Sequence, residues 1–466
     1  MNSTRRQFLR QCGAVSLGFA GLQTLFVRTA NALPDPGHMP NAGFGPLVRD
    51  PRGLLDLPEG FSYTVFSIAG QTMSDGFEVP ARPDGMAAFP GPDGKTIIVR
   101  NHELDGDIAV DGPFGRGNEL FKNIDPKALY DAGFGKTPGL GGTTTILFDT
   151  RAQAKEDERL SLAGTWRNCA GGPTPWNSWI TCEETMVRAS DICEKDHGYN
   201  FEVPALFKGG LASPIPLVAM GRFNHEAIAV DARSGIVYQT EDRGDGAIYR
   251  FIPNTPGQLL NGGRLQALIL RDLPSLDTRN WDITPAVARG QKLPVQWIDL
   301  RHVESPEDDL RYRAYERGAA RFARGEGMWA GSDGIYFACT SGGRAQRGQI
   351  WRYVPSAAEG AAEETANPGT LELFVEPNDS GLVDNADNLT VAPWGDIVVC
   401  EDGSGEQFVV GITPQGDIYK IARNATGDSE FAGACFSPDG TTLFVNVQGL
   451  GLSLAITGPW RKRTQA

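Results

Sequence analysis

The sequence has 466 residues, with 43 Lys and Arg against 57 Asp and Glu and a formal net charge of −14. This acidic excess argues against a nucleic-acid-binding protein, because such proteins neutralise phosphates with clustered Lys and Arg. The 58 Gly and 31 Pro residues stay below the ~25–30% of a chain that marks low-complexity disorder. We therefore expect a globular protein rich in turns and short strands.

The first 32 residues have the pattern of an export signal. The segment TRRQFL (4–9) precedes an apolar run over 12–27, and ANA (30–32) follows it, which is the small-x-small pattern of a signal-peptidase site. A membrane-spanning helix is the competing interpretation, but the run would cover about 24 Å of a hydrocarbon core that is ~30 Å thick. We predict a twin-arginine signal peptide over 1–32. It implies recognition by the twin-arginine export machinery, no stable membrane anchor, and a periplasmic or secreted mature protein.

Residues 33–56 are rich in Pro and Gly without a sustained period, which predicts an extended N-terminal arm. Beyond the arm one unit recurs, with an apolar strand, a tight turn that bears Gly or Pro, and a second strand of β-branched or aromatic residues. Each unit is a predicted hairpin, and further strand-like pieces between the hairpins complete four-stranded sheets. The unit occupies residues 86–103, 163–184, 226–242, 326–343, 387–403 and 433–449.

These hairpins predict a six-bladed β-propeller over residues 57–466. A β-sandwich is the competing all-β fold, although one sandwich rarely holds so many similar hairpins. The widest spacing contains the segment 303–324, in which Ser305-Pro306-Glu307 has the residue types of a helix start. We expect an inserted helix in this segment, and because the insertion ends at Arg324 we expect it to lie over the mouth of the next blade.

Acidic residues recur at the ends of the predicted hairpin strands. In a propeller the innermost strands run along the axis, so their equivalent ends converge on one mouth of the channel. Carboxylates that meet there need cations among them, and their oxygens suit Ca²⁺ or another hard cation. The competing interpretation is that they are ordinary turn residues on solvated loops. The residues concerned are Glu103, Glu183-Glu184, Glu241-Asp242 and Glu401-Asp402 at strand ends and Glu226, Glu326 and Asp387 at strand starts.

Cys182, in the sequence TCEE, places a thiol next to two carboxylates. Soft sulfur selects a transition metal such as iron or zinc, so Cys182 predicts a site that holds more than calcium. Two other interpretations stay open for this residue, namely a small buried apolar side chain and one half of a disulfide with Cys169 or Cys193.

Arg324, two residues before Glu326, is a candidate for binding phosphate, because a guanidinium group matches two phosphate oxygens. Its alternative role is to cap the inserted helix or to pair with a surface acid. The sequence contains no G-x-S-x-G, H-E-x-x-H, C-x-x-C or phosphate-loop motif. These absences leave metal-assisted hydrolysis of an anionic substrate as the chemistry the sequence favours.

The sequence resembles the PhoX-type alkaline phosphatase family in VRNHE (99–103), SWITCEE (178–184), GRFNHEAIAVD (221–231), RGEGMW (324–329) and DNLTVAPWGDIVVCED (387–402). The resemblance implies an exported six-bladed propeller that hydrolyses phosphomonoesters at a cluster of ferric iron (Fe³⁺) and calcium (Ca²⁺) ions bridged by an oxo group. It also implies that Arg324 contacts the phosphate. The metal ligands that it implies are Cys182, Glu226 and Glu326, with Glu103, Glu183, Asp387 and Glu401 as further ligands.

Two other functions are compatible with the sequence. A calcium-dependent propeller hydrolase, either a lactonase or a phytase-like enzyme, would need no cysteine ligand. A non-catalytic propeller would present the acidic residues to a binding partner as ordinary rim charges. The expected partner under the leading hypothesis is a small phosphoester, and the sequence contains no signal for the oligomeric state.

Overall fold

The computed structural model describes residues 43–106 and 111–461. The predicted signal peptide and residues 33–42 of the predicted arm lie outside these ranges. Within them, no helix combines the length and the apolar character that crossing a membrane requires. Antiparallel strands dominate the regular structure, which confirms the prediction of an all-β fold.

The predicted hairpins form the first two strands of successive sheets or half-sheets. The first two sheets contain β4 (Pro83–Pro90), β5 (Thr96–His102), β6 (Gly141–Asp149) and β7 (Ala154–Thr165), and β8 (Asn168–Pro173), β9 (Ser178–Glu183) and β10 (Asn200–Pro204). A large sheet follows, in the order β11 (His225–Val230), β12 (Val237–Glu241), β13 (Ile248–Pro253), β14 (Gly263–Leu270), β15 (Lys292–Asp299), β19 (Thr370–Val375), β18 (Gln349–Val354), β17 (Ile335–Cys339) and β16 (Gly325–Ala330).

The remaining sheets combine strands from both ends of the chain. One has the order β1 (Leu47–Val48), β2 (Leu55–Pro58), β23 (Ile418–Asn424), β22 (Phe408–Ile412), β21 (Ile397–Glu401) and β20 (Ala386–Val391). The other has the order β24 (Phe431–Phe436), β25 (Thr442–Val447), β26 (Leu452–Thr457) and β3 (Ser62–Ile68).

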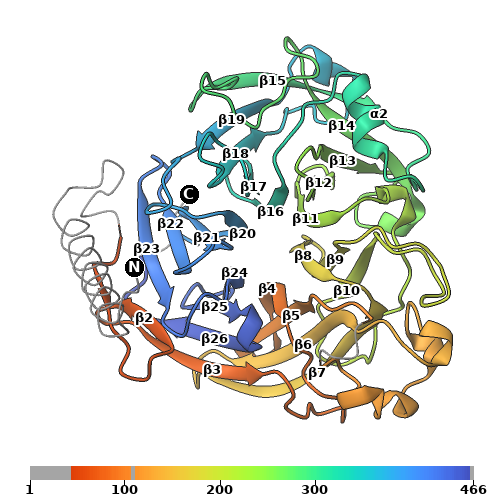
Figure 1. Cartoon of the computed structure of the whole chain (residues 1–466), viewed down its shortest axis with the longest axis vertical. Helices are drawn as coiled ribbons and strands as arrows, with labels where there is room; N and C mark the ends of the chain where they lie inside the picture. Colours follow the sequence, from red (N-terminus) through yellow and green to blue (C-terminus); the bar gives the residue numbers. More distant parts are fainter. Residues whose placement is uncertain (1–42, 107–110, 462–466) are drawn as a thin grey trace, which may run out of the picture.

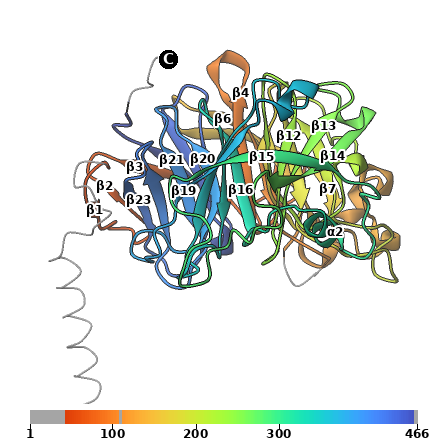
Figure 2. The same ribbon diagram turned by 90° about the horizontal axis from the view of Figure 1, so that it is seen from above.

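The sheets radiate from a central axis, as Figure 1 shows. Figure 2, turned by 90°, shows that inner strands such as β4 and β16 run along this axis. The innermost strands follow one another in a closed ring, since β4 contacts β8, β8 contacts β11, β11 contacts β16, β16 contacts β20, β20 contacts β24, and β24 contacts β4. The sheet arrangement is therefore propeller-like, with a channel along its axis.

Strands from the N-terminal part of the chain close this ring. Strand β3 pairs with β26, from Ser62 opposite Thr457 to Ile68 opposite Leu452, and β2 pairs with β23. The predicted arm thus contributes β1 and the start of β2 to the edge of a sheet. Pairing of this kind covers strand edges that would otherwise expose unpaired backbone groups.

Apolar side chains fill the space between neighbouring sheets. Between the last sheet and the first, the rings of Phe66, Phe148 and Phe444 lie 5.1–5.8 Å apart in edge-to-face contact. A buried ion pair of the first sheet also contacts the last sheet: Arg100 Nη2 donates to Glu158 Oε1 at 2.6 Å within the first sheet, and Arg100 Nη1 donates to Ser453 Oγ of the last sheet at 2.6 Å.

The predicted helix over 303–324 is shorter than expected. Helix α2 covers only Leu310–Glu316, so the prediction that a helix begins near Ser305 is wrong. Ser305 and Asp308 both have left-handed backbone angles, with φ of +41° and +51°, which a right-handed helix cannot contain. The Ser305 hydroxyl instead accepts a hydrogen bond from the Asp309 backbone N–H at 3.0 Å and closes a turn ahead of α2.

Candidate metal centre

The innermost strands share one irregularity near their start. In each of them the pairing with the second strand shifts directly after the first residues, at Pro83, Asn168, His225, Gly325, Ala386 and Ala432. A bulge of this kind redirects the side chains within it, and bulges are common beside functional sites. The residues that follow these positions form what we call the inner ring, at the channel end where the innermost strands begin: Asp84, Cys169, Glu226, Glu326, Asp387 and Gly433.

A second set of residues lies just after the end of the second strands. The backbone N–H groups of Glu103, Glu184, Asp242, Thr340 and Asp402 each donate to the carbonyl oxygen of the residue two positions before an inner-ring residue, at 2.9–3.1 Å. We call these five residues the outer ring. Because the same hydrogen bond recurs in successive sheets, acids at this position are brought to the same mouth of the channel as the inner ring.

The donor atoms of both rings lie close together. Cys169 Sγ is 3.4 Å from Glu226 Oε1 and 3.7 Å from Asp84 Oδ2. At the channel mouth, three groups have ligand atoms that all lie within 4.8 Å of one another, namely Cys169 with Glu184 and Glu226, Glu226 with Glu326 and Asp387, and Asp387 with Asp402 and Glu430. Since Glu226 and Asp387 each belong to two groups, the donors form one continuous cluster across the mouth.

This cluster carries more negative charge than its surroundings neutralise. Burial, reinforced by the neighbouring carboxylates, raises the pKa of Glu226 and Glu326 well above the ordinary value. The same causes raise the pKa of Glu184 to about 8, and burial raises that of Asp387 to about 6. Glu226 Oε2 is buried and has no hydrogen-bond partner. A cation between these oxygens would neutralise the carboxylate charge and give Glu226 Oε2 a partner, so the donor set fits a metal site.

Cys169 makes the donor set mixed. Burial and the nearby Asp84 and Glu226 carboxylates raise the pKa of the Cys169 thiol well above its ordinary value, so the thiolate needs a metal ion beside it to persist. Thiolate sulfur suits iron, whereas carboxylate oxygens suit calcium. The residues present therefore fit a site for two kinds of metal ion.

Arg324 lies at the edge of the cluster. Its Nε and Nη2 donate to Asp242 at 2.8 and 3.1 Å, and Nη2 also donates to Glu326 Oε1 at 2.7 Å. The neighbouring Glu326 raises the pKa of Arg324 further above its ordinary value, so the group stays charged. The side chain remains 37% exposed, which leaves it open to a ligand from solvent.

The structure brings together Glu103, Glu226, Glu326, Asp387 and Arg324 from the residues that the sequence singled out. It places three others elsewhere. Cys182 is fully buried in an apolar cluster with residues such as Ile180 and Ile228, because it lies on the second strand of its sheet, between sheets and away from the channel.

Glu183 and Glu401 are directed away from the channel mouth. Glu183 accepts hydrogen bonds from the backbone N–H groups of Trp166, Gly198 and Tyr199 and lies 2.6 Å from His197 Nδ1. Glu401 accepts from the backbone N–H groups of Asp384 and Phe408 and from Lys420 Nζ. Both are the last residues of second strands, where successive side chains point to opposite sides. Their following neighbours, Glu184 and Asp402, face the mouth instead.

Sequence reasoning named Glu184, Asp242 and Asp402 among the strand-end acids without assigning them as ligands, and it missed the other donors of the cluster, namely Asp84, Cys169 and Glu430. A signal for some of them was present. Arg82-x-Asp84, Arg167-x-Cys169 and Arg324-x-Glu326 repeat one spacing at the start of three innermost strands. Aligning the hairpins on this spacing would have indicated Cys169 as the inner-ring thiol.

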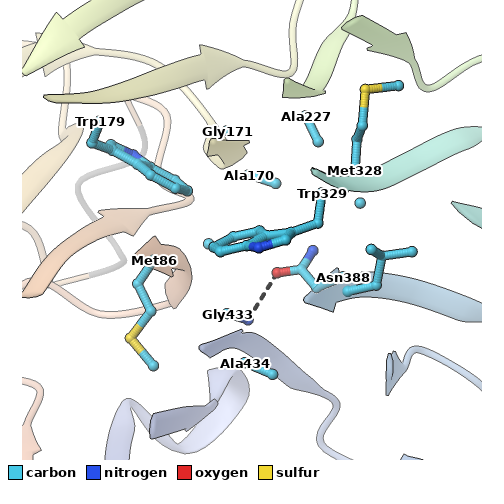
Figure 3. A pocket seen from close by; sticks show the side chains of 13 residues that line it. Met86, Ala170, Gly171, Trp179, Ala227, Met328, Trp329, Asn388, Gly433 and Ala434 are labelled. Atoms are coloured by element: carbon cyan, nitrogen blue, oxygen red, sulfur yellow. Dashed lines mark hydrogen bonds between the residues drawn. The ribbon is translucent and has the colours of Figure 1, made fainter. Parts of the chain in front are cut away.

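Small residues and one tryptophan close the channel beneath the cluster. At Gly85 and Gly327 a Cβ would lie 2.6 Å from the backbone of the next innermost strand, so the strands there approach as closely as glycine allows. Figure 3 shows Trp329 lying across the channel near Trp179 and Asn388. The cavity that remains is about 20 Å³, room for about one water molecule. The cluster is therefore open to solvent on its mouth side and closed below.

The ring of sheets and the thiol and carboxylate cluster at one mouth define a propeller-like protein with a candidate metal centre. Comparison with known proteins then identifies the family, because the family model of the alkaline phosphatase PhoX matches residues 42–151 and 145–451. The chain belongs to the PhoX alkaline phosphatase family, whose activity is that of a phosphomonoesterase. A search among curated proteins gave no match.

One solved structure agrees with this assignment at the level of the fold. The structure of Pseudomonas fluorescens PhoX in complex with vanadate, a transition state analogue, has a TM-score of 0.61 at 17% identity and covers 87% of this chain and 96% of that chain. A gluconolactonase from Xanthomonas campestris (TM-score 0.35, 12% identity, 89% and 98% covered) and a protein of unknown function from Bacteroides thetaiotaomicron (TM-score 0.41, 8% identity, 85% and 76% covered) are less similar in structure.

Proposed function

We propose that this protein is an exported phosphomonoesterase that works with ferric iron and calcium held at the mouth of a six-bladed propeller. The observation that carries the proposal is the cluster of Glu226, Glu326 and Asp387, whose ligand atoms lie within 4.8 Å of one another with an unpartnered oxygen on Glu226. The blade count rests on the closed ring of innermost strands, each of which begins one blade in this proposal.

The proposed ligands follow from donor chemistry. Cys169 and Glu226 would hold iron, because the sulfur is the soft donor of the cluster. We transfer the thiolate role from Cys182 to Cys169, since the latter is the thiol that contacts Glu226. Glu326, Asp387 and the outer-ring acids would hold calcium, which takes six to eight oxygen ligands. When bound, the metal ions supply Lewis acidity and an activated oxygen nucleophile.

The protein's own residues bind and orient the substrate. Asp242 and Glu326 hold the guanidinium plane of Arg324, and its Nη1 group has no hydrogen-bond partner within the described ranges, so it can donate to a non-bridging phosphate oxygen. Arg324 thereby neutralises charge that grows in the transition state. Trp329 keeps bulk water out of the channel below. The open mouth lets the leaving alcohol depart to solvent.

Export is proposed on the sequence of residues 1–32, which lie outside the described ranges. Twin-arginine transport carries folded proteins, so metals can be loaded before export. The test is N-terminal sequencing of protein recovered from a native host's periplasm or medium. A mature chain that begins at Leu33 would support the proposal, and an uncleaved cytoplasmic chain would contradict it.

The experiment that tests the whole proposal combines elemental analysis with a phosphomonoester assay on one natively exported sample. Iron and calcium in a fixed ratio, together with hydrolysis, would support it. Calcium without iron would favour a calcium-dependent lactonase or phytase-like hydrolase. A folded sample without metal or activity, whose melting temperature does not respond to Ca²⁺, would point to a binding propeller.

A further inference from the structure

Arg167 occupies the same position in its sheet as Arg324 does in its own. Each arginine lies two residues before an inner-ring residue, Cys169 or Glu326, and each has a left-handed backbone angle, with φ of +47° and +53°. This conformation is unfavourable for a residue with a side chain, and it tends to occur at functional sites. The strained position therefore carries the same side chain directly before the innermost strands β8 and β16, and it recurs at Arg82 before β4, with φ of +46°.

Both arginines are held in the same way. Arg167 Nη2 lies 2.5 Å from Glu103 Oε1 and donates to Glu184 Oε2 at 2.8 Å, while Nε donates to the Glu184 carbonyl oxygen at 3.2 Å. As in Arg324, Nε and Nη2 are engaged, and Nη1 has no hydrogen-bond partner in the described part of the chain. Neither Nη1 atom is a buried atom without a partner, so both Nη1 groups are accessible to solvent. The Arg167 and Arg324 side chains are 39% and 37% exposed.

The two arginines lie on opposite sides of Glu226. Strands β8 and β16 both contact β11, which carries Glu226. Arg167 donates to Glu184, whose ligand atom lies within 4.8 Å of that of Glu226. Arg324 donates to Glu326, whose ligand atom also lies within 4.8 Å of that of Glu226. Each guanidinium group is thus separated from Glu226 by one carboxylate.

We propose that Arg167 is a second phosphate-binding residue, which together with Arg324 holds the phosphate group of the substrate from opposite sides of Glu226. A phosphomonoester has three non-bridging oxygens, so two preorganised guanidinium groups can bind different oxygens of one phosphate. Arg82 has the equivalent position in the first sheet, but within the described residues its guanidinium group makes only an ion pair with Glu103 at 3.7 Å. It lacks the hydrogen bonds that fix the other two. The inference rests on the proposed function, since it assigns a substrate contact at the same site.

The test compares Arg167→Lys and Arg167→Gln with the wild-type metal-loaded protein. Arg324→Lys serves as the reference for a phosphate contact, and Arg233→Lys serves as the control, because Arg233 is 62% exposed and pairs with Asp231 in the turn between β11 and β12. For each protein, the KM and kcat for p-nitrophenyl phosphate, the inhibition constant of inorganic phosphate, the metal content and the melting temperature are measured. We expect both Arg167 variants to show at least tenfold higher KM and phosphate inhibition constant, with the metal content unchanged.

Two outcomes would overturn the assignment of Arg167. In one, the Arg167 variants keep wild-type KM and phosphate inhibition while Arg324→Lys is impaired. In the other, they lose metal ions in parallel with phosphate affinity, which would show that Arg167 only positions Glu103 and Glu184. A wild-type protein that does not hydrolyse the phosphomonoester would instead refute the proposed function and this inference with it. Arg167→Lys keeps the positive charge beside both carboxylates, so the melting temperature separates a folding defect from a binding defect.

Discussion

Exchanging two cysteines for serine separates the structural assignment of the thiol ligand from the one based on sequence. Cys169 Sγ lies 3.4 Å from Glu226 Oε1 at the channel mouth, whereas Cys182 is 0% exposed in an apolar cluster. Serine is nearly isosteric with cysteine but offers a hard oxygen that does not replace a thiolate ligand to iron. Cys169→Ser should therefore lose iron and activity, and Cys182→Ser should lose neither.

We expect Cys169→Ser to change activity and Cys182→Ser to change stability. Even residues that only orient a metal ligand change metal affinity or activity by roughly 10–100-fold, so replacing the ligand itself should lower kcat by at least about 100-fold. Cys182→Ser buries a hydroxyl without an apparent partner, which costs roughly 1–3 kcal/mol of unfolding free energy. Plasma mass spectrometry, a phosphomonoester assay and denaturant unfolding on both variants would measure these effects.

The reasoning would be refuted by the reverse result. If Cys182→Ser loses iron and activity while Cys169→Ser keeps both, the thiol at the cluster is not the ligand. Cys435→Ser is a matched control, because Cys435 is also buried in an apolar cluster. It should resemble Cys182→Ser, with lower stability and unchanged iron content.

Three further outcomes follow from the structure. Burial alone would lower the pKa of His197, but Glu183 and Asp131 on its two ring nitrogens raise it to about 9. The stability that the protonated His197 contributes is therefore complete below about pH 6.5 and is lost as the pH rises to about 9. The melting temperature of the wild-type protein should fall more steeply over this pH range than that of His197→Gln. Removing the metals with a chelator should lower the melting temperature and adding Ca²⁺ should restore it, whereas equal melting of both forms would argue against a metal centre. Trp329→Ala should reduce activity and lower the unfolding free energy by about 1–3 kcal/mol. This loss is smaller than the ~3–5 kcal/mol expected for a fully buried Trp, because the Trp329 side chain is half-buried. Unchanged stability in denaturant unfolding would contradict the packing of Trp329 at the closed end of the channel.

Part of the candidate metal centre could be predicted from the sequence because its acids lie at strand ends. Glu226, Glu326 and Asp387 were identified since each directly opens a predicted hairpin. The choice between Glu183 and Glu184 was beyond the sequence, because a shift of one position turns a side chain from the channel mouth to the space between sheets. Cys169 was missed for a related reason, since its bulge is a property of the pairing between β8 and β9.

The sequence by itself determined the hairpins, because each strand finds its partner across a short turn and the pattern is local. It also determined the family, through motifs that lie within single hairpins. Only the tertiary structure decided how the ring closes, since β3 and β26 are nearly 400 residues apart and pair at Ser62 and Thr457. It alone decided which thiol meets Glu226 and which arginines flank it, because those contacts join residues from different innermost strands that are far apart in the sequence.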